Sequence, residues 1–369
     1  MSAPLPTVAV VLPPREGFGP GRTGAIGLLA RRLTGTPGFQ TVIYGGRQEG
    51  PIFPGIDFRP VTPGFWPPGN INIRYAATIA DQLKKQPPAL IEVHNRPEIA
   101  LALASRLPAT PVTVILNNDP QGMREATTPA ERTDMLRRLA RVITSSDYLR
   151  RRVLDGVAAP PHQPVVLHNC LDLAELPPPV AKKERLILFA GRVVRDKAPD
   201  AFVSACAAAL PFLPGWHAQI IGADRFSFDS PDTAFVQTVR AAADAAGVHM
   251  LGYRDHPEVL NAMARAAIVV VPSRWPEPFG LVALEALASG AALVCSPRGG
   301  LPEVAGDAAV YANPDDPAEM ATAIKELGHD DARRLALAAA GRAHAKAFDM
   351  PVIAAQLAAL RRDVLTRRG

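Results

Sequence analysis

Short apolar segments alternate with amphipathic segments along the chain, and this alternation occurs in two series. In the first series, we expect buried strands at residues 7–12, 40–44, 90–94, 112–116, 141–144 and 165–168. The segments between them, such as 24–33, 73–85 and 98–106, carry apolar residues at helical spacing. Buried strands that alternate with helices are typical of a parallel sheet with crossover helices.

The second series follows an acidic, proline-rich segment at residues 172–180. Its expected strands are residues 185–190, 216–221, 248–251, 267–272, 291–295 and 310–311. The pattern therefore predicts an α/β protein with one domain at residues 1–170 and another at 171–350. We expect two doubly wound, Rossmann-like parallel-sheet domains facing across a cleft, with ligands at the carboxyl ends of the strands. An amphipathic helix at 351–369 is expected to cross back to the first domain.

Composition narrows the class of protein. Three widely separated cysteines without metal-ligand spacing are interpreted as reduced core thiols, which predicts a cytoplasmic protein. The N-terminus does not resemble a secretory signal, and no apolar run is long enough to span a bilayer.

Charge is divided unevenly between the two halves. Residues 1–170 carry 19 Lys and Arg against 12 Asp and Glu, a net charge of +7, whereas residues 171–369 carry a net charge of −2. Basic clusters at 84–85, 137–141 and 150–152 suggest an anionic acceptor or contact with the inner face of a membrane, although each could be a solvated helix face. No basic stretch is interleaved with stacking aromatics, which argues against nucleic acid.

Residues 273–290 are the most informative stretch. Gly280 is expected to open a helix that Gly290 closes, and the helix between them is apolar on every face except at Glu285. A carboxylate in a buried helix needs partners. Glu285 is therefore expected to bind ligand hydroxyls such as a ribose diol, with a buried ion pair to Arg or Lys as the alternative.

The start of the same helix suggests a second contact. Amides at Gly280, Leu281 and Val282 lack helical partners and suit a diphosphate. Glu277 lies just outside this end and could reach another part of the ligand. Arg192 and Lys197, in the loop after the strand at 185–190, are two cations suited to the same diphosphate.

Together these residues resemble the retaining glycosyltransferases of family 4, which have the GT-B fold. Glu277 and Glu285 match the two-glutamate signature with seven intervening residues, and the Gly299-Gly300-Leu301 segment fits the same pattern. The match is specific over about residues 165–350 and looser in the first half. Lys197 is followed by Ala198, where the family often has glycine.

The resemblance implies roles for the matched residues. Glu277 would contact the transferred sugar, amides from Phe279 to Val282 would bind sugar and phosphate, and Glu285 would bind the ribose. Arg192 and Lys197 would neutralise the diphosphate leaving group. The nucleotide base would be held by the loop of Gly252, Tyr253 and Arg254.

In the first half, glycines follow the first expected strand, at Gly19, Gly21 and Gly24. They resemble the family's first loop, which approaches the donor or acceptor. Their spacing also fits a dinucleotide fingerprint, but no matching acidic ribose ligand follows.

Two polar residues end neighbouring strands of the first half. His94 resembles the pocket histidine that the family places against the donor sugar. Asp119 follows the next strand and is a candidate for an acceptor-orienting or acid–base carboxylate.

The resulting hypothesis is a retaining transferase that moves a hexose from a UDP-, GDP- or ADP-sugar to a saccharide or lipid-linked acceptor. It would serve cell-envelope polysaccharide, lipopolysaccharide or glycolipid synthesis. We expect no cofactor beyond the sugar nucleotide and no metal, since the chain has no Asp-x-Asp motif. Alternatives are a sugar-nucleotide 2-epimerase of the same architecture, an inactive scaffold, and a dinucleotide-dependent oxidoreductase.

Overall fold

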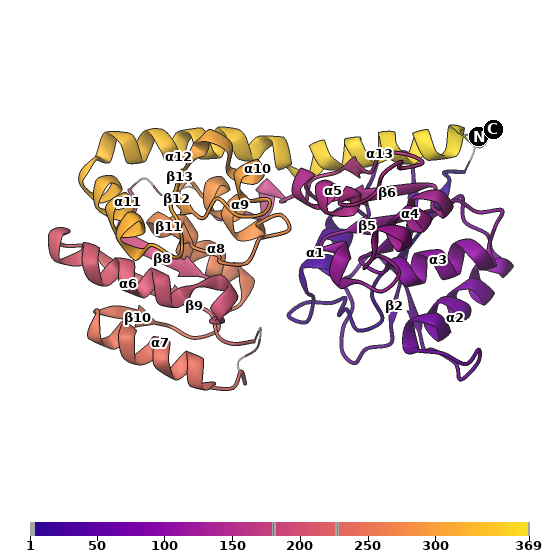
Figure 1. Ribbon diagram of the computed structural model, residues 1–369, viewed down its shortest axis with the longest axis horizontal. Helices are drawn as coiled ribbons and strands as arrows, with labels where there is room; N and C mark the ends of the chain where they lie inside the picture. The colour runs from indigo at the N-terminus through magenta and orange to yellow at the C-terminus, as the bar shows by residue number, and fades with distance from the viewer. Residues whose placement is uncertain (1–3, 179, 181, 226, 228, 368–369) are drawn as a thin grey trace. The chain divides into compact units, whose positions relative to one another are not determined.

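The computed structural model describes residues 4–178, 180, 182–225, 227 and 229–367. The chain divides into two units, shown in Figure 1. Unit 1 contains Met1–Cys170 with Met350–Gly369, and unit 2 contains Leu171–Asp349. Among the described residues, no helix combines the length and hydrophobicity needed to cross a bilayer.

Unit 1 is built on a seven-stranded sheet in the order β3-β2-β1-β4-β5-β6-β7, in which all paired strands are parallel. Its strands are β1 (Thr7–Val11), β2 (Gln40–Gly46), β3 (Asp57–Val61), β4 (Leu90–His94), β5 (Val112–Leu116), β6 (Arg141–Thr144) and β7 (Val165–Val166). Its α-helices are α1 (Ala25–Arg32), α2 (Ile71–Lys85), α3 (Pro97–Arg106), α4 (Pro129–Arg138), α5 (Asp147–Leu154) and α13 (Met350–Thr366). The strand order reverses between β1 and β4, as in Rossmann-like sheets.

The strand β3 was missed by the hydrophobic pattern. Its sequence, Asp-Phe-Arg-Pro-Val, carries polar residues and a proline, and only its last residue is buried. Pro60 cannot donate a ladder hydrogen bond, which confines such a segment to a sheet edge. The strand pairs with β2 alone and forms that edge.

Unit 2 contains a six-stranded parallel sheet in the order β10-β9-β8-β11-β12-β13. Its strands are β8 (Glu184–Ala190), β9 (His217–Ile221), β10 (Val248–Met250), β11 (Ala266–Val271), β12 (Ala292–Cys295) and β13 (Ala309–Tyr311). Its α-helices are α6 (Pro199–Ala209), α7 (Ala234–Ala245), α8 (His256–Arg265), α9 (Leu281–Ala288), α10 (Leu301–Ala305), α11 (Pro317–His329) and α12 (Asp331–Ala345). The prediction of two Rossmann-like parallel-sheet domains is confirmed.

Both faces of the central strands are buried in each sheet. In β8, Ile187 and Phe189 join a core with α6, α7 and α11, whereas Leu186 and Leu188 join the opposite core with α8 and α9. Successive side chains of a strand point to opposite faces, so a strand covered on both faces is continuously apolar. This explains why the strands of unit 2 were recognisable from sequence.

The last helix is attached to unit 1 by a buried ion pair. Arg361 of α13 donates to both carboxylate oxygens of Glu92 in β4, at 3.1 and 2.5 Å. The two side chains are 1% and 2% exposed, and the guanidinium lies over the ring of Phe39. Removal of either partner would leave a charge buried without compensation, which is strongly destabilising.

We predict that Arg361→Met lowers the free energy of unfolding of unit 1 by about 3–5 kcal/mol, because Glu92 stays buried without its cation. The measurement is urea unfolding followed by circular dichroism. The double variant Glu92→Leu with Arg361→Met should recover most of the loss. Arg367→Met is the matched control: its partner Asp363 lies one turn away on the exposed helix surface, and the expected loss is below about 1 kcal/mol. Equal losses in the two single variants would contradict this interpretation.

Candidate functional site

The loops at the carboxyl edge of the sheet in unit 2 are joined through their backbones. The amide of Gly191, after β8, donates to Ile221 at 3.0 Å, and that of Gly222, after β9, donates to Gly252 at 2.8 Å. A Cβ at Gly222 would lie 1.8 Å from the carbonyl oxygen of Gly191, so only glycine fits there. This packing fixes the backbone where the predicted diphosphate and base loops, at 192–197 and 252–254, begin.

Two predicted site residues, Lys197 and Glu277, form an ion pair with each other. Glu277 is 9% exposed, and its Oε1 also accepts a hydrogen bond of 2.5 Å from the hydroxyl of Ser273. The other carboxylate oxygen, Oε2, has no partner among the described residues. The cation and the carboxylate were predicted separately, each from its own segment. Ser273, which orients the carboxylate, was not predicted as a site residue.

Glu285 has a different partner from the one considered in the sequence. Its side chain is 6% exposed, and its Oε1 lies 2.8 Å from Nε2 of His256. The alternative of a buried pair with Arg or Lys is not what the structure contains. His256 is the first residue of α8, directly after the N-cap Asp255, and its place shortly after the predicted base loop was the signal available in the sequence.

The start of α9 provides backbone amides beside these carboxylates. Gly280 has a φ of +107° and occupies the N-cap without a side-chain cap, and no acidic residue lies in the first turn. Phe279 is 2% exposed and packs against the ring of Phe348, so its side chain belongs to the core. Leu281 and Val282 are partly buried and pack against the same core. The backbone at the start of α9 is therefore the part of this segment that suits a diphosphate.

Two glycines in the connection after β12, Gly299 and Gly300, contact the backbone of the Glu277 loop. Gly299 has a φ of +67°, and a Cβ there would lie 2.2 Å from the carbonyl oxygen of Glu277. The amide of Gly300 donates to the same carbonyl at 2.6 Å. Side chains at these positions would push the loop away, so the glycines set the position of the carboxylate.

Four charged side chains connect the ends of adjacent strands in unit 2. Arg274, after β11, makes paired hydrogen bonds of 2.8 and 2.9 Å with Asp200 at the start of α6. Arg274 also bonds Asp315, after β13, which in turn bonds Arg298, after β12. Hydrogen bonding to Asp200 raises the pKa of Arg274, and hydrogen bonding to Arg298 lowers the pKa of Asp315. The network was not found from sequence.

In unit 1, the glycines of the first loop are required by the loop itself. A Cβ at Gly19 would lie 2.0 Å from the carbonyl oxygen of Pro51, and Gly21 has a φ of +70°. Gly24 precedes α1, where the carboxylate of Glu16 accepts a hydrogen bond of 2.9 Å from the amide of Gly27. A pyrophosphate at this helix start would meet that carboxylate, which disfavours the dinucleotide interpretation.

His94 ends β4 within a buried polar cluster. It is 4% exposed, and burial lowers its pKa to about 4, so the imidazole is neutral at pH 7. The next residue, Asn95, has a φ of +56° and accepts hydrogen bonds from the amides of Asn117 and Asn118. Within the part of the chain that the structure describes, the buried polar atoms here without a hydrogen-bond partner are His94 Nδ1, Asn95 Nδ2, both side-chain polar atoms of Asn117, and Ser145 Oγ. Unpaired buried groups at a strand end suit water or ligand hydroxyls.

Both carboxylate oxygens of Asp119 already have hydrogen-bond partners, whereas the predicted acid–base role needs an accessible oxygen. One oxygen accepts from the amide of Gln121 at 3.0 Å, and the other accepts from Nε of Arg152 at 2.8 Å. The carboxylate therefore caps the short helix Pro120–Gly122 and holds Arg152. Its acid–base role stays a prediction.

The basic clusters named from sequence are largely paired with neighbouring acids. Asp147 bonds Arg150 and Arg151, Asp134 bonds Arg137 and Arg138, Arg141 bonds Asp363, and Lys84 bonds Asp81. Four acids serve six cations here, so the charge of the clusters is offset in part.

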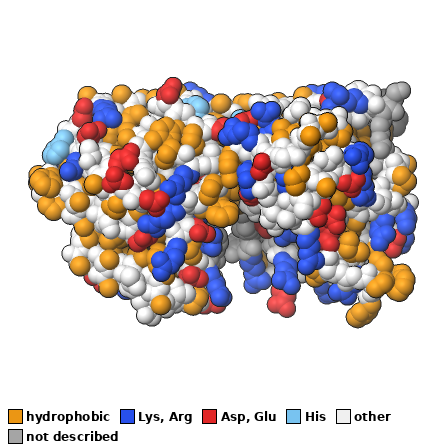
Figure 2. Space-filling view, viewed as in Figure 1, with side chains coloured by type: hydrophobic (Ala, Val, Ile, Leu, Met, Phe, Trp, Pro, Cys, Tyr) orange, Lys and Arg blue, Asp and Glu red, His pale blue; other side chains and the backbone are white. Residues whose placement is uncertain are grey.

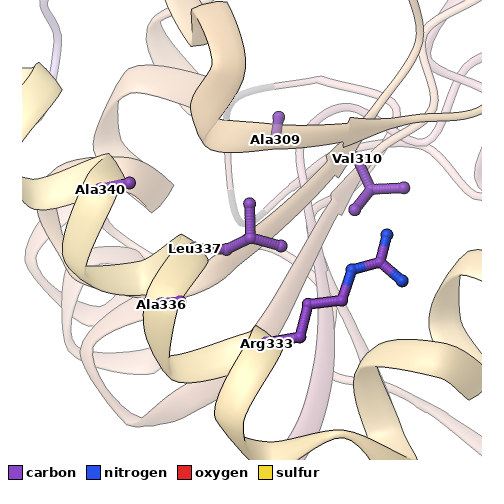
Figure 3. Close-up of a pocket in the computed structure, with 6 residues that line it drawn as sticks. All are labelled: Ala309, Val310, Arg333, Ala336, Leu337 and Ala340. Carbon is purple, nitrogen blue, oxygen red and sulfur yellow. The ribbon is translucent and has the colours of Figure 1, made fainter.

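A cavity of about 420 Å³ lies elsewhere in unit 2, between β13 and α12 (Figure 3). Its lining is Ala309, Val310, Arg333, Ala336, Leu337 and Ala340. None of the predicted site residues lines it, and five of the six side chains are apolar, so it offers little chemistry.

Comparisons with known proteins cover both units. The family described as Glycosyltransferase Family 4 matches residues 26–175, and the family described as Glycosyl transferases group 1 matches residues 176–344. The chain is 31% identical over 186 residues to the D-inositol 3-phosphate glycosyltransferase of Corynebacterium aurimucosum, covering 49% of this chain and 44% of that protein. The chain spans about half the length of the curated relatives it matches.

Solved structures resemble the chain over nearly its whole length. Sucrose-phosphate synthase from Thermosynechococcus elongatus has a TM-score of 0.78 at 19% identity, covering 98% of this chain and 100% of that one. HepE of Anabaena, solved in complex with UDP and glucose, has a TM-score of 0.75 at 18% identity, covering 96% and 99%. At these identities the likeness concerns the fold.

We predict that Gly299→Ala destabilises unit 2 by several kcal/mol more than Gly247→Ala. The two glycines have nearly equal φ values of +67° and +68°, but a Cβ at Gly247 meets nothing within 4 Å. Backbone strain alone costs about 1–2 kcal/mol, and the excess at Gly299 comes from contact with the Glu277 backbone. Thermal and urea unfolding measure the stability of both variants. Equal losses of unfolding free energy would show that the Glu277 loop moves aside with no loss of stability, which would contradict the prediction.

Protonation of His94 should make stability depend on pH. The unfolded histidine binds a proton below pH 6.5, whereas the folded one does so only near pH 4. Stability therefore falls as the pH drops from 6.5 to about 4, by up to about 3 kcal/mol. Urea unfolding at pH 7.5 and pH 5 should show this loss in the native chain and a smaller one in His94→Gln. Replacing the exposed His249 with Gln serves as control, and an unchanged pH dependence in His94→Gln would refute the assignment.

Proposed function

The chain belongs to glycosyltransferase family 4, with the GT-B fold, and from this premise we propose that it transfers a sugar from a nucleoside-diphosphate sugar to an acceptor hydroxyl, with retention of configuration. The observation that carries the proposal is the group of residues at the carboxyl edge of unit 2. Two buried glutamates each have one oxygen held by the protein and lie beside an uncapped helix start.

The donor would be held along the start of α9. Glu285, fixed by His256, offers its second oxygen to a ribose hydroxyl, and Glu277 offers its own to the transferred sugar. Amides from Gly280 to Val282 would bind the diphosphate together with Arg192 and Lys197. The loop of Gly252, Tyr253 and Arg254 would hold the base.

Catalysis would come mainly from stabilising the leaving group. The bond between C1 and the diphosphate breaks, and the diphosphate departs with the electron pair. The acceptor oxygen bonds C1 from the same face and releases its proton to the leaving phosphate or to water. Because Lys197 is already paired with Glu277, its charge is held in place and needs little reorganisation as negative charge develops.

The neutral imidazole of His94 can exchange hydrogen bonds with sugar hydroxyls but carries no charge to the reaction. Asp119 would act by positioning, since both oxygens are engaged. The first-loop glycines would bring the backbone near the donor or acceptor. We propose metal-independent transfer, because the cations named above can neutralise the diphosphate.

We propose the donor and the acceptor by chemical class. HepE was solved with UDP and glucose, which makes UDP-glucose the first donor to test, followed by GDP- and ADP-sugars. The acceptor would be a saccharide or a lipid-linked sugar, with a phosphorylated acceptor in the C. aurimucosum relative as precedent. A cytoplasmic role in envelope polysaccharide, lipopolysaccharide or glycolipid synthesis stays a prediction.

The 2-epimerase and the inactive scaffold are the competing functions. An epimerase would deprotonate a sugar carbon and exchange its hydrogen with solvent deuterium. A scaffold would neither turn over the donor nor release nucleoside diphosphate. Both differ from a transferase in the products of a single incubation.

We predict that one class of sugar nucleotide stabilises the native chain in EDTA, by about 2.7 kcal/mol at a concentration one hundred times its Kd. Glu285→Ala should lose this shift because the ribose contact is gone. Glu184→Ala, on an exposed ion pair with Arg265, is the matched control and should keep it. Thermal shift measures binding, and slow release of nucleoside diphosphate measures transfer to water. The proposal fails if millimolar UDP-, GDP- and ADP-sugars leave the melting temperature unchanged.

A further inference from the structure

Two adjacent aromatic side chains stand exposed on unit 1. Phe65 is 97% exposed and Trp66 is 80% exposed, in the connection between β3 and α2. Figure 2 shows hydrophobic side chains gathered at the lower right of this unit, near the helix that Figure 1 labels α2. Large apolar side chains exposed side by side mark a surface that another phase or molecule covers.

The connection that carries these rings is anchored at both ends. The amide of Gly64 donates to the hydroxyl of Thr78 in α2 at 3.2 Å. Asn70 caps α2 by accepting hydrogen bonds from the amides of Asn72 and Ile73. The rings therefore project from a connection fixed to α2 and bury little surface against the unit.

Exposed arginines occupy the neighbouring loops of the same sheet edge. Arg15 follows β1, Arg47 follows β2, and Arg22 lies in the first loop. These loops adjoin: the amide of Arg47 donates to Val61, the last residue of β3, at 3.2 Å, and a Cβ at Gly46 would lie 1.9 Å from the carbonyl oxygen of Pro14. With β3, β2 and β1 adjacent, the three strand ends lie within about 10 Å.

Among the described residues, the three arginines of this edge form no ion pair with a carboxylate, unlike most cations of the helix clusters. Within the described residues, Arg15 and Arg47 have no carboxylate partner, and Arg22 donates to the backbone carbonyl of Glu49. The acids of the same loops are Glu16, which accepts from the amide of Gly27 at the start of α1, and the exposed Glu49. The edge therefore presents three arginines beside the exposed rings, with these two acids offsetting part of their charge.

We propose that the edge formed by Phe65, Trp66, Arg15, Arg22 and Arg47 docks unit 1 on the surface of an anionic lipid bilayer. Trp and Phe rings partition to the headgroup region, where an apolar body meets water. Arginines at the same level attract anionic headgroups, each strengthening binding by about fivefold. A bilayer suits two adjacent rings exposed on most sides better than a single sugar ring does, because a sugar would stack on one face and need polar partners around it.

The test is cosedimentation of the full chain with vesicles of phosphatidylcholine alone or with about one-third phosphatidylglycerol, at low and high salt. We expect salt-sensitive binding to the anionic vesicles. Phe65→Ser with Trp66→Ser should weaken it by about tenfold or more, and Arg15→Gln with Arg47→Gln by about 30-fold. The matched control is Arg150→Gln with Arg151→Gln, which removes the same charge from an ion-paired cluster and should leave most of the binding intact.

The outcomes separate the proposal from its rivals. Native chain that binds neither vesicle, or aromatic variants that bind as well as native chain, would overturn it. A shift of the Trp66 emission, taken as the difference from Trp66→Phe, should accompany the anionic vesicles; a shift with soluble oligosaccharide alone would instead identify a saccharide platform and overturn it. Melting temperatures should stay unchanged, since these side chains pack on little. No sugar nucleotide is present, so the result is independent of the transferase proposal.

Discussion

The candidate site in unit 2 depends on one charge network that joins four adjacent strand ends. Arg274 bonds Asp200 and Asp315, and Asp315 bonds Arg298. These residues follow or precede the loops of β8, β11, β12 and β13, which are neighbours in the sheet. Each side chain is only partly buried, so each bond contributes modestly to stability. The loops of Lys197 and Glu277 are also joined through their backbones, since the amides of Arg274 and Trp275 donate to the carbonyl of Asp196 at 2.9 and 3.0 Å.

The two buried glutamates of this site are held in the same way, through one carboxylate oxygen each. Ser273 and Lys197 hold one oxygen of Glu277, and His256 holds one oxygen of Glu285. A half-satisfied carboxylate is oriented before a ligand arrives, so binding needs little loss of side-chain freedom. The predicted alternative for Glu285 was an ion pair with Arg or Lys, and the structure places a partly exposed histidine there.

Unit 1 supplies a different kind of surface. His94, Asn95 and Asn117 bring to the ends of β4 and β5 buried polar atoms that have no partner among the described residues, which is unusual in a folded interior. The same sheet edge carries arginines after β1 and β2 and exposed rings after β3, on the other side of β4 from β5. The sequence shows the basic excess, but only the structure shows which of these cations form ion pairs with acids on the same helices.

The sequence by itself determined the alternation of strands and helices and the limits of α9. Buried strands and a helix between Gly280 and Gly290 are local properties, set by side-chain hydrophobicity and by glycine's freedom at positive φ. Only the tertiary structure decided which side chains meet. Arg361 and Glu92 are 269 residues apart, and His256 reaches Glu285 from another helix. Such pairs follow from strand order and register, which bring distant segments together and leave no periodic signal in the chain.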